Sequence, residues 1–248
     1  MIDVHFVPTP NGNKVTIMLE EVGLPYRLIP YDMLEGEHLT PAFRRINPNG
    51  RLPAIVDHEP TGGGEPFAVF ESGAILLYLS EKAGGALTPA DPRGRSLAQQ
   101  WLMWQMAGLG PMHGQAHHFI RYAPEGQEYG VARYGAEAQR LLAVMEARLG
   151  EADYLAGEYS VADIAAWPWV RATYAIGLDL EPYPNVRRWL DAIATRPAVQ
   201  RGVETRNAPN LQSRRPTLTP QQWSNLFGEN MHRSFGVAAA AADREPPR

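Results

Sequence analysis

The sequence predicts an α/β unit followed by an all-helical domain, and three observations support this fold class. Strand and helix patterns alternate over residues 1–86, and strand patterns disappear after residue 94. Turn-forming residues separate the two halves at 87–94. The chain of 248 residues is long enough for two packed domains with full cores. We therefore expect a first domain at 1–86, a linker at 87–94, a helical domain at 95–205 and a C-terminal extension at 206–248.

The first half is expected to follow the order βαβαββα. Residues 4–7 have the pattern of a short strand, and turn-forming residues then lead into a helix whose apolar face stops at Gly23. Residues 26–31 have the pattern of a second strand. Because strand, helix and strand follow each other within about 30 residues, these two strands are expected to be parallel.

A second helix, a hairpin and a third helix complete this unit. The second helix is expected near 41–46. Strand patterns at 52–56 and 67–70 flank three consecutive glycines at 62–64, which suit a loose hairpin loop. Residues 72–82 then present an apolar helical face and end before two further glycines.

After residue 94 the pattern is helical and rich in tryptophan, which predicts an all-α domain packed on the first unit. Within it, Ser160 and Asp163 have the spacing of a capping box, in which each side chain bonds a backbone amide of the other. We interpret this pair as a folding device rather than as a catalytic pair.

The extension is polar except for one island. Thr219 is followed by proline and, three residues later, by Gln222, which is typical of a helix start. An apolar stripe at helical spacing follows: Trp223, Leu226, Phe227 and Met231. We expect a short helix near 220–231 that docks on the body. It either covers exposed apolar surface or narrows a cleft beside it.

Charge and hydropathy exclude several classes of protein. The formal charge of -4 gives no basic excess for nucleic acid. No apolar run approaches about 18 residues, so no membrane partner is expected. The first residues lack a basic segment followed by a long apolar one, so no signal peptide is expected either. A cytoplasmic protein fits these features best.

Cysteine is absent, which excludes a disulfide framework, a thiolate metal site and a catalytic cysteine. Any thiol chemistry must therefore use a thiol that a ligand brings. His113, His117 and His118 lie close together in a helical stretch, and residues four apart face the same side of a helix. A zinc site needs at least one ligand beyond such a pair and a shell of supporting groups, and the sequence indicates neither. We expect no metal.

Thr9 and Asn11 stand where the first strand leads into the first helix. The free amides and dipole of a helix N-terminus stabilise an anion or thiolate and lower the pKa of a thiol. A hydroxyl or side-chain amide there adds a donor to the sulfur. The same residues could simply cap the helix, and both interpretations stay open at this point.

Two further segments could bind a ligand backbone. Pro53 stands at the head of a strand, where a cis bond after Leu52 would turn neighbouring backbone groups toward a ligand. Glu71 and Ser72 join a strand to a helix, where Ser72 could cap the helix and the free amides could hold a carboxylate. Glu71 could accept from an ammonium group, so the pair suits a zwitterionic amino-acid end. A cap beside a solvated acid is the alternative.

Five motifs in order give these residues a familiar context. They are residues 8–12 (PTPNG), 47–57 (NPNGRLPAIVD), 70–79 (FESGAILLYL), 108–112 with 117–119, and 160–163 with 167–169. Over about residues 1–205 the chain resembles the glutathione S-transferase superfamily. It most closely resembles the nu-class, Ure2-like branch, whose bacterial members are glutathione-dependent disulfide-bond reductases.

The resemblance implies a thioredoxin-like N-terminal domain, an all-helical C-terminal domain, and a homodimer that binds glutathione as GSH or GSSG. It implies that Thr9 and Asn11 face the sulfur and that the backbone of Leu52, before a cis Pro53, pairs with the cysteinyl part. Glu71 and Ser72 match the positions that hold the γ-glutamyl end.

Two more positions follow from the resemblance. Arg133 matches an arginine that reaches across the dimer to the ligand, whose carboxylate its planar fork suits. His38 stands where the family often has glutamine. A histidine can still donate to the glycyl carboxylate, but its contribution would depend on pH.

The resulting prediction is an enzyme that reduces a small disulfide with an activated glutathione thiolate, without any protein cysteine. The same thiolate could conjugate an electrophilic substrate or reduce a peroxide. The alternative is a non-catalytic regulatory or interaction protein on the same fold, since fold does not fix function. Whether glutathione binds at all discriminates between the two.

Overall fold

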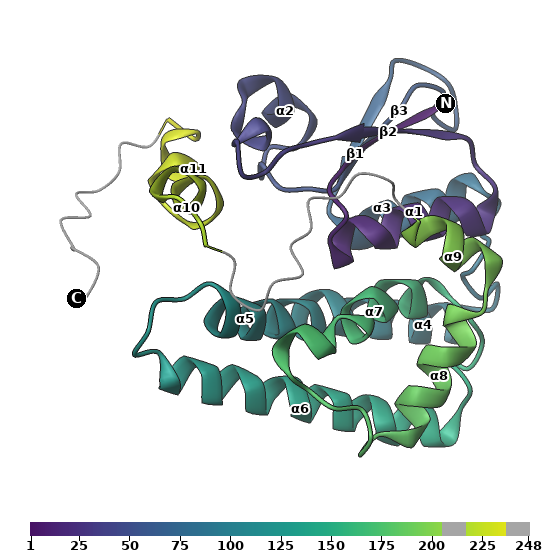
Figure 1. Ribbon diagram of the computed structural model, residues 1–248. Coiled ribbons are helices and arrows are strands. Elements are labelled where there is room, and N and C mark those ends of the chain that lie inside the picture. Colours follow the sequence, from purple (N-terminus) through teal and green to yellow (C-terminus); the bar gives the residue numbers. More distant parts are fainter. Residues whose placement is uncertain (205–216, 237–248) are drawn as a thin grey trace.

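The computed structural model describes residues 1–204 and 217–236, and it consists of an α/β domain packed on a helical domain (Figure 1). The first domain has the predicted order. Its elements are β1 (Ile2–Phe6), α1 (Pro10–Val22), β2 (Tyr26–Pro30), α2 (Pro41–Ile46), β3 (Ala54–Asp57), β4 (Phe67–Phe70) and α3 (Ser72–Lys82), with a 3-10 turn at Glu37–Leu39.

The four strands form one mixed sheet in the order β2-β1-β3-β4. β1 and β2 run parallel, with Ile2 opposite Tyr26, which confirms the prediction from their spacing. β3 is antiparallel to both β1 and β4. The glycines at 62–64 all have positive φ and lie in the loop of the β3–β4 hairpin, as expected.

Helices α1 and α3 lie on the face of the sheet that looks toward the helical domain (Figure 1). The domains are packed closely there. Gly202 belongs to α9 (Pro197–Val203), the last helix of the helical domain before residue 204. A Cβ atom at Gly202 would lie 2.7 Å from the Cα atom of Ile17, so only glycine lets α9 approach α1 so closely. The hydroxyl of Thr16 also donates to the carbonyl of Gly202 at 2.6 Å. This close packing holds the two domains in one relative position, and it therefore also fixes the walls of a site between them.

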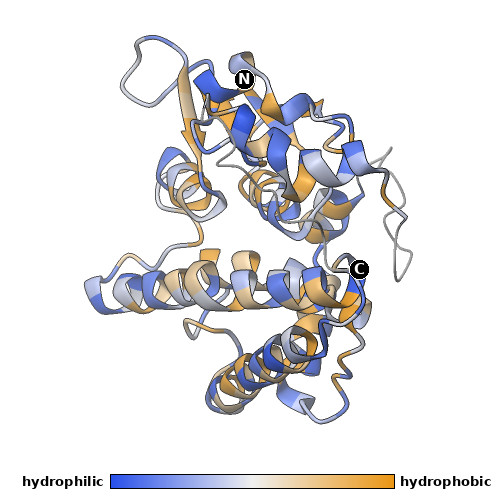
Figure 2. Ribbon diagram, turned by 90° about the vertical axis from the view of Figure 1, so that its left-hand side faces the viewer, coloured by the Kyte–Doolittle hydropathy of each residue, from blue (hydrophilic) through white to orange (hydrophobic). Residues whose placement is uncertain are grey.

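The helical domain contains six α-helices within the described residues up to 204. They are α4 (Pro92–Trp104), α5 (Gly110–Arg121), α6 (Glu128–Glu151), α7 (Val161–Arg171), α8 (Pro184–Ala194) and α9 (Pro197–Val203). A π-helical turn, Gln105–Leu109, joins α4 to α5, and a 3-10 turn, Thr173–Ile176, follows α7. Hydrophilic and hydrophobic stretches alternate along the helices, as in amphipathic helices (Figure 2).

Helix α4 begins at Pro92, inside the segment 87–94 that the sequence predicts as a linker. The carboxylate of Asp91 accepts from the backbone amides of Arg93 and Gly94, at 3.1 and 2.9 Å. Asp91 and Pro92 thus act as the cap and first residue of a helix, positions that these residue types favour as much as they favour turns.

The carboxylate of Asp163 confirms the folding role predicted for it. One oxygen accepts from the amide of Leu155 at 3.0 Å and from the indole of Trp189 at 2.8 Å. The other accepts from the amide and hydroxyl of Ser160, at 3.0 and 3.1 Å. Burial raises the pKa of Asp163, but these four donors oppose that effect.

The extension contains two helices, α10 (Pro220–Phe227) and α11 (Glu229–Arg233), where the sequence predicts one near 220–231. The helix start at Thr219 is confirmed, with the reciprocal bonds of a capping box to Gln222. The break is at Gly228, where a Cβ atom would lie 2.9 Å from the Cα atom of Ser224. Both helices lie between α2 and α5 (Figure 1). In the described ranges no helix is long and apolar enough to cross a membrane.

Candidate active site

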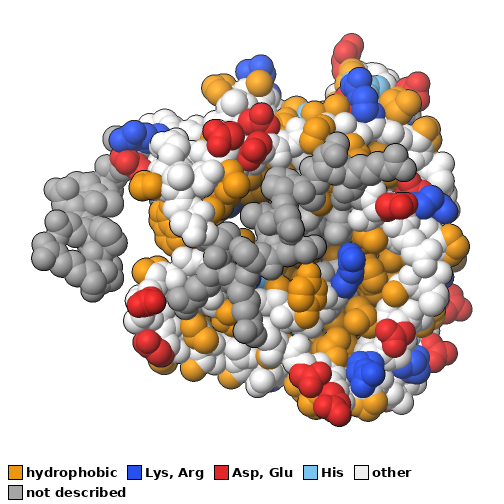
Figure 3. All heavy atoms as spheres, in the orientation of Figure 1, with side chains coloured by type: hydrophobic (Ala, Val, Ile, Leu, Met, Phe, Trp, Pro, Cys, Tyr) orange, Lys and Arg blue, Asp and Glu red, His pale blue; other side chains and the backbone are white. Residues whose placement is uncertain are grey.

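A cleft with two connected lobes lies between the domains. The first lobe, of about 800 Å³, is lined by the β1–α1 junction, residues 47–53 and the start of α3, and by α5 and α7 opposite. The second lobe, of about 740 Å³, lies between the start of α5 and the extension. The two lobes share six residues: Asn11, Arg51, Glu71, Met106, Gly114 and Trp169. On the face drawn in Figure 3, hydrophobic side chains form several exposed patches among scattered charged groups.

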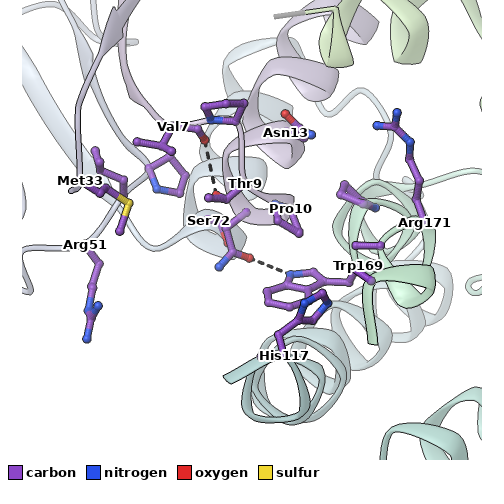
Figure 4. Close-up of a pocket in the computed structure, with 18 of the residues that line it drawn as sticks. Val7, Thr9, Pro10, Asn13, Met33, Arg51, Ser72, His117, Trp169 and Arg171 are labelled. Atoms are coloured by element: carbon purple, nitrogen blue, oxygen red, sulfur yellow. Dashed lines mark hydrogen bonds between the residues drawn. The ribbon is translucent and has the colours of Figure 1, made fainter. Parts of the chain in front are cut away.

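Thr9 both caps α1 and lines the first lobe. Its hydroxyl oxygen accepts from the amide of Gly12 at 3.3 Å. Its O–H group donates to the carbonyl of Val7 at 3.4 Å (Figure 4). Both contacts are long, so the hydroxyl can turn toward a stronger acceptor in the cleft. A Cβ atom at residue 12 would lie 2.1 Å from the carbonyl oxygen of Val7, so a glycine is required for this junction. Thr9 can therefore cap α1 and also face a ligand in the cleft, so the two interpretations left open by the sequence are compatible.

Asn11 is oriented by a tryptophan of the helical domain. Its Oδ1 atom accepts from Nε1 of Trp169 at 2.9 Å (Figure 4). An indole N–H can only donate, so the oxygen of the amide must face it and the NH₂ group must face away. Asn11 lines both lobes. It therefore presents a donor to the cleft beside the N-terminus of α1.

The segment before β3 is shaped by a buried asparagine. The side chain of Asn47 donates to the carbonyl of Arg51 at 2.5 Å and accepts from the amide of Asn49 at 2.9 Å. The peptide bond between Leu52 and Pro53 is cis, as the resemblance implies, and both residues line the first lobe. The backbone of this segment thus faces the cleft in a fixed conformation.

Glu71 has a φ of +68°, one of two positive values among non-glycine residues in the described ranges. Such a conformation costs about 1–3 kcal/mol and is found mainly at functional sites. The carboxylate of Glu71 lies on the cleft wall, where Nδ2 of Asn49 approaches it at 3.4 Å. The fold thus tolerates strain at the residue that presents an acid to the cleft.

Ser72 does not cap α3, contrary to the prediction from sequence. The capping position is Glu71, and Ser72 is the first helical residue. The hydroxyl of Ser72 instead accepts from Nζ of Lys14 at 3.2 Å. Because its side chain is engaged there, the amides at the start of α3 are left for another acceptor. Ser72 lines the first lobe, as expected.

The sequence analysis did not predict a role for Lys14, although its side chain joins the two domains. Its side chain is 1% exposed, and its ammonium lies 2.7 Å from Oε1 of Gln105 and 3.4 Å from Sδ of Met106. Burial lowers the pKa of Lys14 to about 7, and the charge of Glu71 opposes this shift. Lys14 lines the second lobe.

The lowered pKa of Lys14 can be measured directly, because the chain has two lysines, Lys14 and Lys82. In isotope-labelled Lys82→Arg protein, we expect the remaining lysine side-chain NMR signal to titrate near pH 7. The unfolded chain holds this proton up to about pH 10.5, so unfolding takes up a proton between pH 7 and 10.5. The free energy of unfolding should therefore rise with pH across that window. A signal that titrates only near pH 10.5 would contradict the burial argument.

His38 and Arg133 do not line either lobe. His38 is 1% exposed, and within the described residues neither ring nitrogen has a hydrogen-bond partner. Burial and the nearby charge of Arg51 lower the pKa of His38 to about 4, so its charge does not change near neutral pH. Arg133 is 53% exposed on α6, where it lies 3.7 Å from Glu137. In the single chain, therefore, neither His38 nor Arg133 reaches the cleft.

The helical wall adds groups that the sequence analysis did not predict as glutathione-site residues. Among them are Arg121 and two residues labelled in Figure 4, His117 and Arg171. The ring of His117 meets that of Trp169 edge-on at 6.3 Å, and burial lowers the pKa of His117 to about 4. His113, one turn earlier, donates to the carbonyl of Leu109 at 2.9 Å. In the described ranges no three potential ligands form a metal-binding group.

Comparison with known proteins gives this geometry a context. Residues 9–82 match the model of the glutathione S-transferase N-terminal domain, and residues 128–192 match that of the C-terminal domain. The chain is 53% identical to the disulfide-bond oxidoreductase YfcG of Escherichia coli over 199 residues, which are 80% of this chain and 92% of that protein. It is 38% identical to YghU of the same organism over 224 residues, 84% of this chain and 76% of that protein.

Solved structures agree with this match. A glutathione transferase from Burkholderia graminis, with two glutathione molecules per subunit, is 45% identical, with a TM-score of 0.78 over 82% of this chain and 88% of that one. A glutathione transferase from Pseudomonas putida, with one glutathione disulfide per subunit, is 41% identical, with a TM-score of 0.77 over 82% and 90%. Ure2p in complex with glutathione is 33% identical, with a TM-score of 0.77 over 82% and 94%.

Proposed function

The chain belongs to the glutathione S-transferase family, and on this premise we propose that it is a glutathione-dependent disulfide-bond reductase. Its nucleophile is the thiolate of bound glutathione, because the chain has no cysteine to supply one. The observation that carries the proposal is the junction of β1 and α1. There the hydroxyl of Thr9 and the amide of Asn11 stand beside a helix N-terminus in the cleft between the domains.

Glutathione is proposed to lie along the first lobe with its sulfur at Thr9 and Asn11. The backbone of Leu52 pairs with its cysteinyl part. The carboxylate of Glu71 accepts from the γ-glutamyl ammonium, and the amides at the start of α3, beside Ser72, hold the adjacent carboxylate. Glu71 and Ser72 both line this lobe, which supports the assignment.

Arg51 is better placed than His38 to bind the glycyl carboxylate of glutathione. Arg51 lines both lobes, whereas His38 lines neither, is buried and has a pKa of about 4. A neutral buried imidazole offers little to a carboxylate, while a guanidinium binds it bidentately. We therefore assign this end of the ligand to Arg51 and give His38 a supporting place.

The reaction is thiol–disulfide exchange in two steps. The thiolate of one glutathione attacks a disulfide R–S–S–R, forms the mixed disulfide GS–SR and releases RS⁻, which takes up a proton. A second glutathione thiolate attacks the glutathione sulfur of GS–SR, forms GSSG and releases the second RS⁻. The two glutathiones lose two protons and two electrons, and the substrate gains them. Donors at Thr9, Asn11 and the helix end lower the pKa of the attacking thiol.

The functional unit is proposed to be a homodimer of the nu-class type in the cytoplasm, where glutathione is the main thiol reductant. Exposed apolar side chains on β4 and α4 support an interface. Phe67, Phe70 and Met103 are 51%, 36% and 50% exposed. Contact with a second copy would bury them. In such a dimer Arg133 of one subunit is proposed to reach the carboxylates of the ligand in the other.

Turnover of bis(2-hydroxyethyl) disulfide with glutathione tests this function. We expect GSSG to form well above the uncatalysed rate, and calorimetry to show that GSH or GSSG binds. Binding without turnover of any disulfide would replace the reductase with a conjugating or peroxide-reducing transferase. Failure to bind either form would contradict the proposal and favour a regulatory protein on this fold.

A further inference from the structure

A buried lysine lies beside the start of α3 and has no anionic partner there. Lys14 stands one turn after Asn11 on α1 and is 1% exposed. Its ammonium donates to three uncharged groups: the hydroxyl of Ser72, Oε1 of Gln105 and Sδ of Met106. In the described parts of the chain no carboxylate pairs with it. A buried ammonium without a counterion is costly, so this position is suited to a ligand that brings the anion.

Two glycines leave room for the side chains that hold Lys14. A Cβ atom at Gly110 would lie 2.7 Å from Nε2 of Gln105, and one at Gly73 would lie 2.8 Å from Cγ of Met106. Gln105 and Met106 open the π-helical turn between α4 and α5, and turns of this kind are frequent at functional sites. The lysine of α1 is therefore held between the first turn of α3 and the helical domain.

The hydroxyl of Ser72 connects this ammonium to the cleft. Lys14 lines the second lobe and not the first, whereas Ser72 lines the first (Figure 4). The oxygen of Ser72 accepts from Lys14 at 3.2 Å, and its O–H group donates to Sδ of Met106 at 3.6 Å. A thioether is a weak acceptor, so the O–H group can turn to a carboxylate in the cleft while the oxygen still accepts from the ammonium. Hydrogen bonds in such a chain polarise and strengthen one another.

We propose that Lys14 is a positioning residue for the γ-glutamyl carboxylate of glutathione, on which it acts through the hydroxyl of Ser72. This inference rests on the proposed function, which places that carboxylate beside Ser72 at the start of α3. The ammonium of Lys14 supplies the positive charge, and the hydroxyl transmits its effect to the cleft. Glu71 accepts from the ammonium of the same ligand end, so the γ-glutamyl group meets one protein charge of each sign.

A carboxylate at this place favours the charged form of Lys14. Burial lowers the pKa of Lys14 to about 7 in the free protein, and the charge of Glu71 opposes this shift. A further negative charge raises the pKa, so the protein with ligand should keep this proton to higher pH.

The other charged groups around α1 do not account for such a change. In the second lobe Arg51 stays protonated, and burial lowers the pKa of His118 below its usual range, so neither changes its charge above pH 7. Within the described residues, the remaining ionisable side chains of the helices packed on α1 do not bond to Lys14: Glu81 and Lys82 of α3, Asp163 and Arg171 of α7, and Arg201 of α9.

The charge of Lys14 can be followed by NMR in full-length Lys82→Arg protein, in which it is the one lysine. We expect its side-chain signal to titrate at least about one pH unit higher with saturating S-methylglutathione, a ligand without a free thiol, than without ligand. The matched ligand is S-methyl-(4-aminobutyryl)cysteinylglycine, which keeps the ammonium and lacks only the γ-glutamyl carboxylate. It should not raise the titration. An equal rise with both ligands would overturn the proposal.

Calorimetry with the same two ligands tests the contact through variants. Lys14→Met removes the charge and keeps an unbranched side chain. It should weaken S-methylglutathione about tenfold and the ligand without the carboxylate less than about twofold. Ser72→Ala should weaken S-methylglutathione at least as much. Because both residues act in one chain of hydrogen bonds, the double variant should be no weaker than Ser72→Ala alone.

Thr16→Val is the matched control on the same helix. It removes the buried bond from Thr16 to the carbonyl of Gly202, which also joins the two domains, and Thr16 lines neither lobe. We expect both affinities to stay as in the wild type. Circular dichroism verifies that each variant is folded, and if Lys14→Met does not fold, the NMR titration decides.

The outcomes separate this inference from the function on which it rests. If neither glutathione nor S-methylglutathione binds the wild type, the proposed function itself fails. If both test ligands bind and Lys14→Met weakens them equally, Lys14 acts only through packing, and only this inference is overturned. Additive losses in the double variant would overturn it as well, because Lys14 would then act without Ser72.

Discussion

Replacement of Thr9 by alanine is expected to lower kcat/KM for disulfide reduction about 10²-fold, because it removes a hydroxyl donor from the proposed thiolate position. Thr9→Ser keeps the hydroxyl and should stay within about fivefold of the wild type. The hydroxyl now makes only two long contacts, 3.3 and 3.4 Å, so it can turn to the sulfur at little cost. Steady-state kinetics with bis(2-hydroxyethyl) disulfide measures both variants.

Thr9 also caps α1, so a lost cap must be separated from a lost donor. The chain offers a matched control in Thr40, whose hydroxyl caps α2 by accepting from the amide of Phe43 at 3.3 Å and which lines neither lobe. Each alanine variant should lose about 1 kcal/mol of unfolding free energy. Only Thr9→Ala should lose turnover. Equal losses of activity in the two variants would mean that Thr9 acts only through folding.

Replacement of Asn11 by aspartate is expected to lower kcat/KM at pH 7 by about 10² or more. An aspartate oxygen can still accept from the indole of Trp169, so the side chain keeps its anchor. Its second oxygen, however, replaces the NH₂ donor with a negative charge beside the thiolate. A like charge disfavours the ionised form of a neighbouring group, so the pKa of the bound thiol should rise.

The pH profile distinguishes this electrostatic effect from a distorted site. Because the thiolate forms at higher pH in Asn11→Asp, the rise of kcat/KM with pH should shift upward by about one unit. Trp169→Phe removes the donor that orients Asn11 without adding a charge, so it should reduce activity without shifting the profile. An Asn11→Asp profile that is merely scaled down at every pH would contradict the donor role.

Most of the first domain followed from local patterns, whereas the placement of Thr9, Asn11, Leu52, Glu71 and Ser72 on one cleft was implied by the family resemblance. Strand and helix periods, turn residues and the spacing of the first two strands are local properties of the chain. The residues at the junctions of strands and helices lie together because those junctions share one end of the sheet.

What the sequence did not predict depends on contacts between distant residues. Ser72 was expected to cap α3, but a lysine 58 residues earlier in the chain engages its hydroxyl. The bond from Trp169 to Asn11 spans 158 residues and has no local signal. His38 looked like an accessible donor, yet the tertiary fold buries it. Gly228 breaks the last helix within a stripe whose apolar spacing continues through it.

The most direct test of the account is the pKa of the glutathione thiol when it is bound. Thiolate absorbance in the ultraviolet, titrated with saturating protein, measures it. The account predicts a value at least about one unit below the free thiol value of about 8.5. It also predicts that Thr9→Ala combined with Asn11→Ala returns the pKa close to the free value. A bound thiol that titrates like free glutathione, or a lowered pKa that the double variant leaves unchanged, would contradict the central claim.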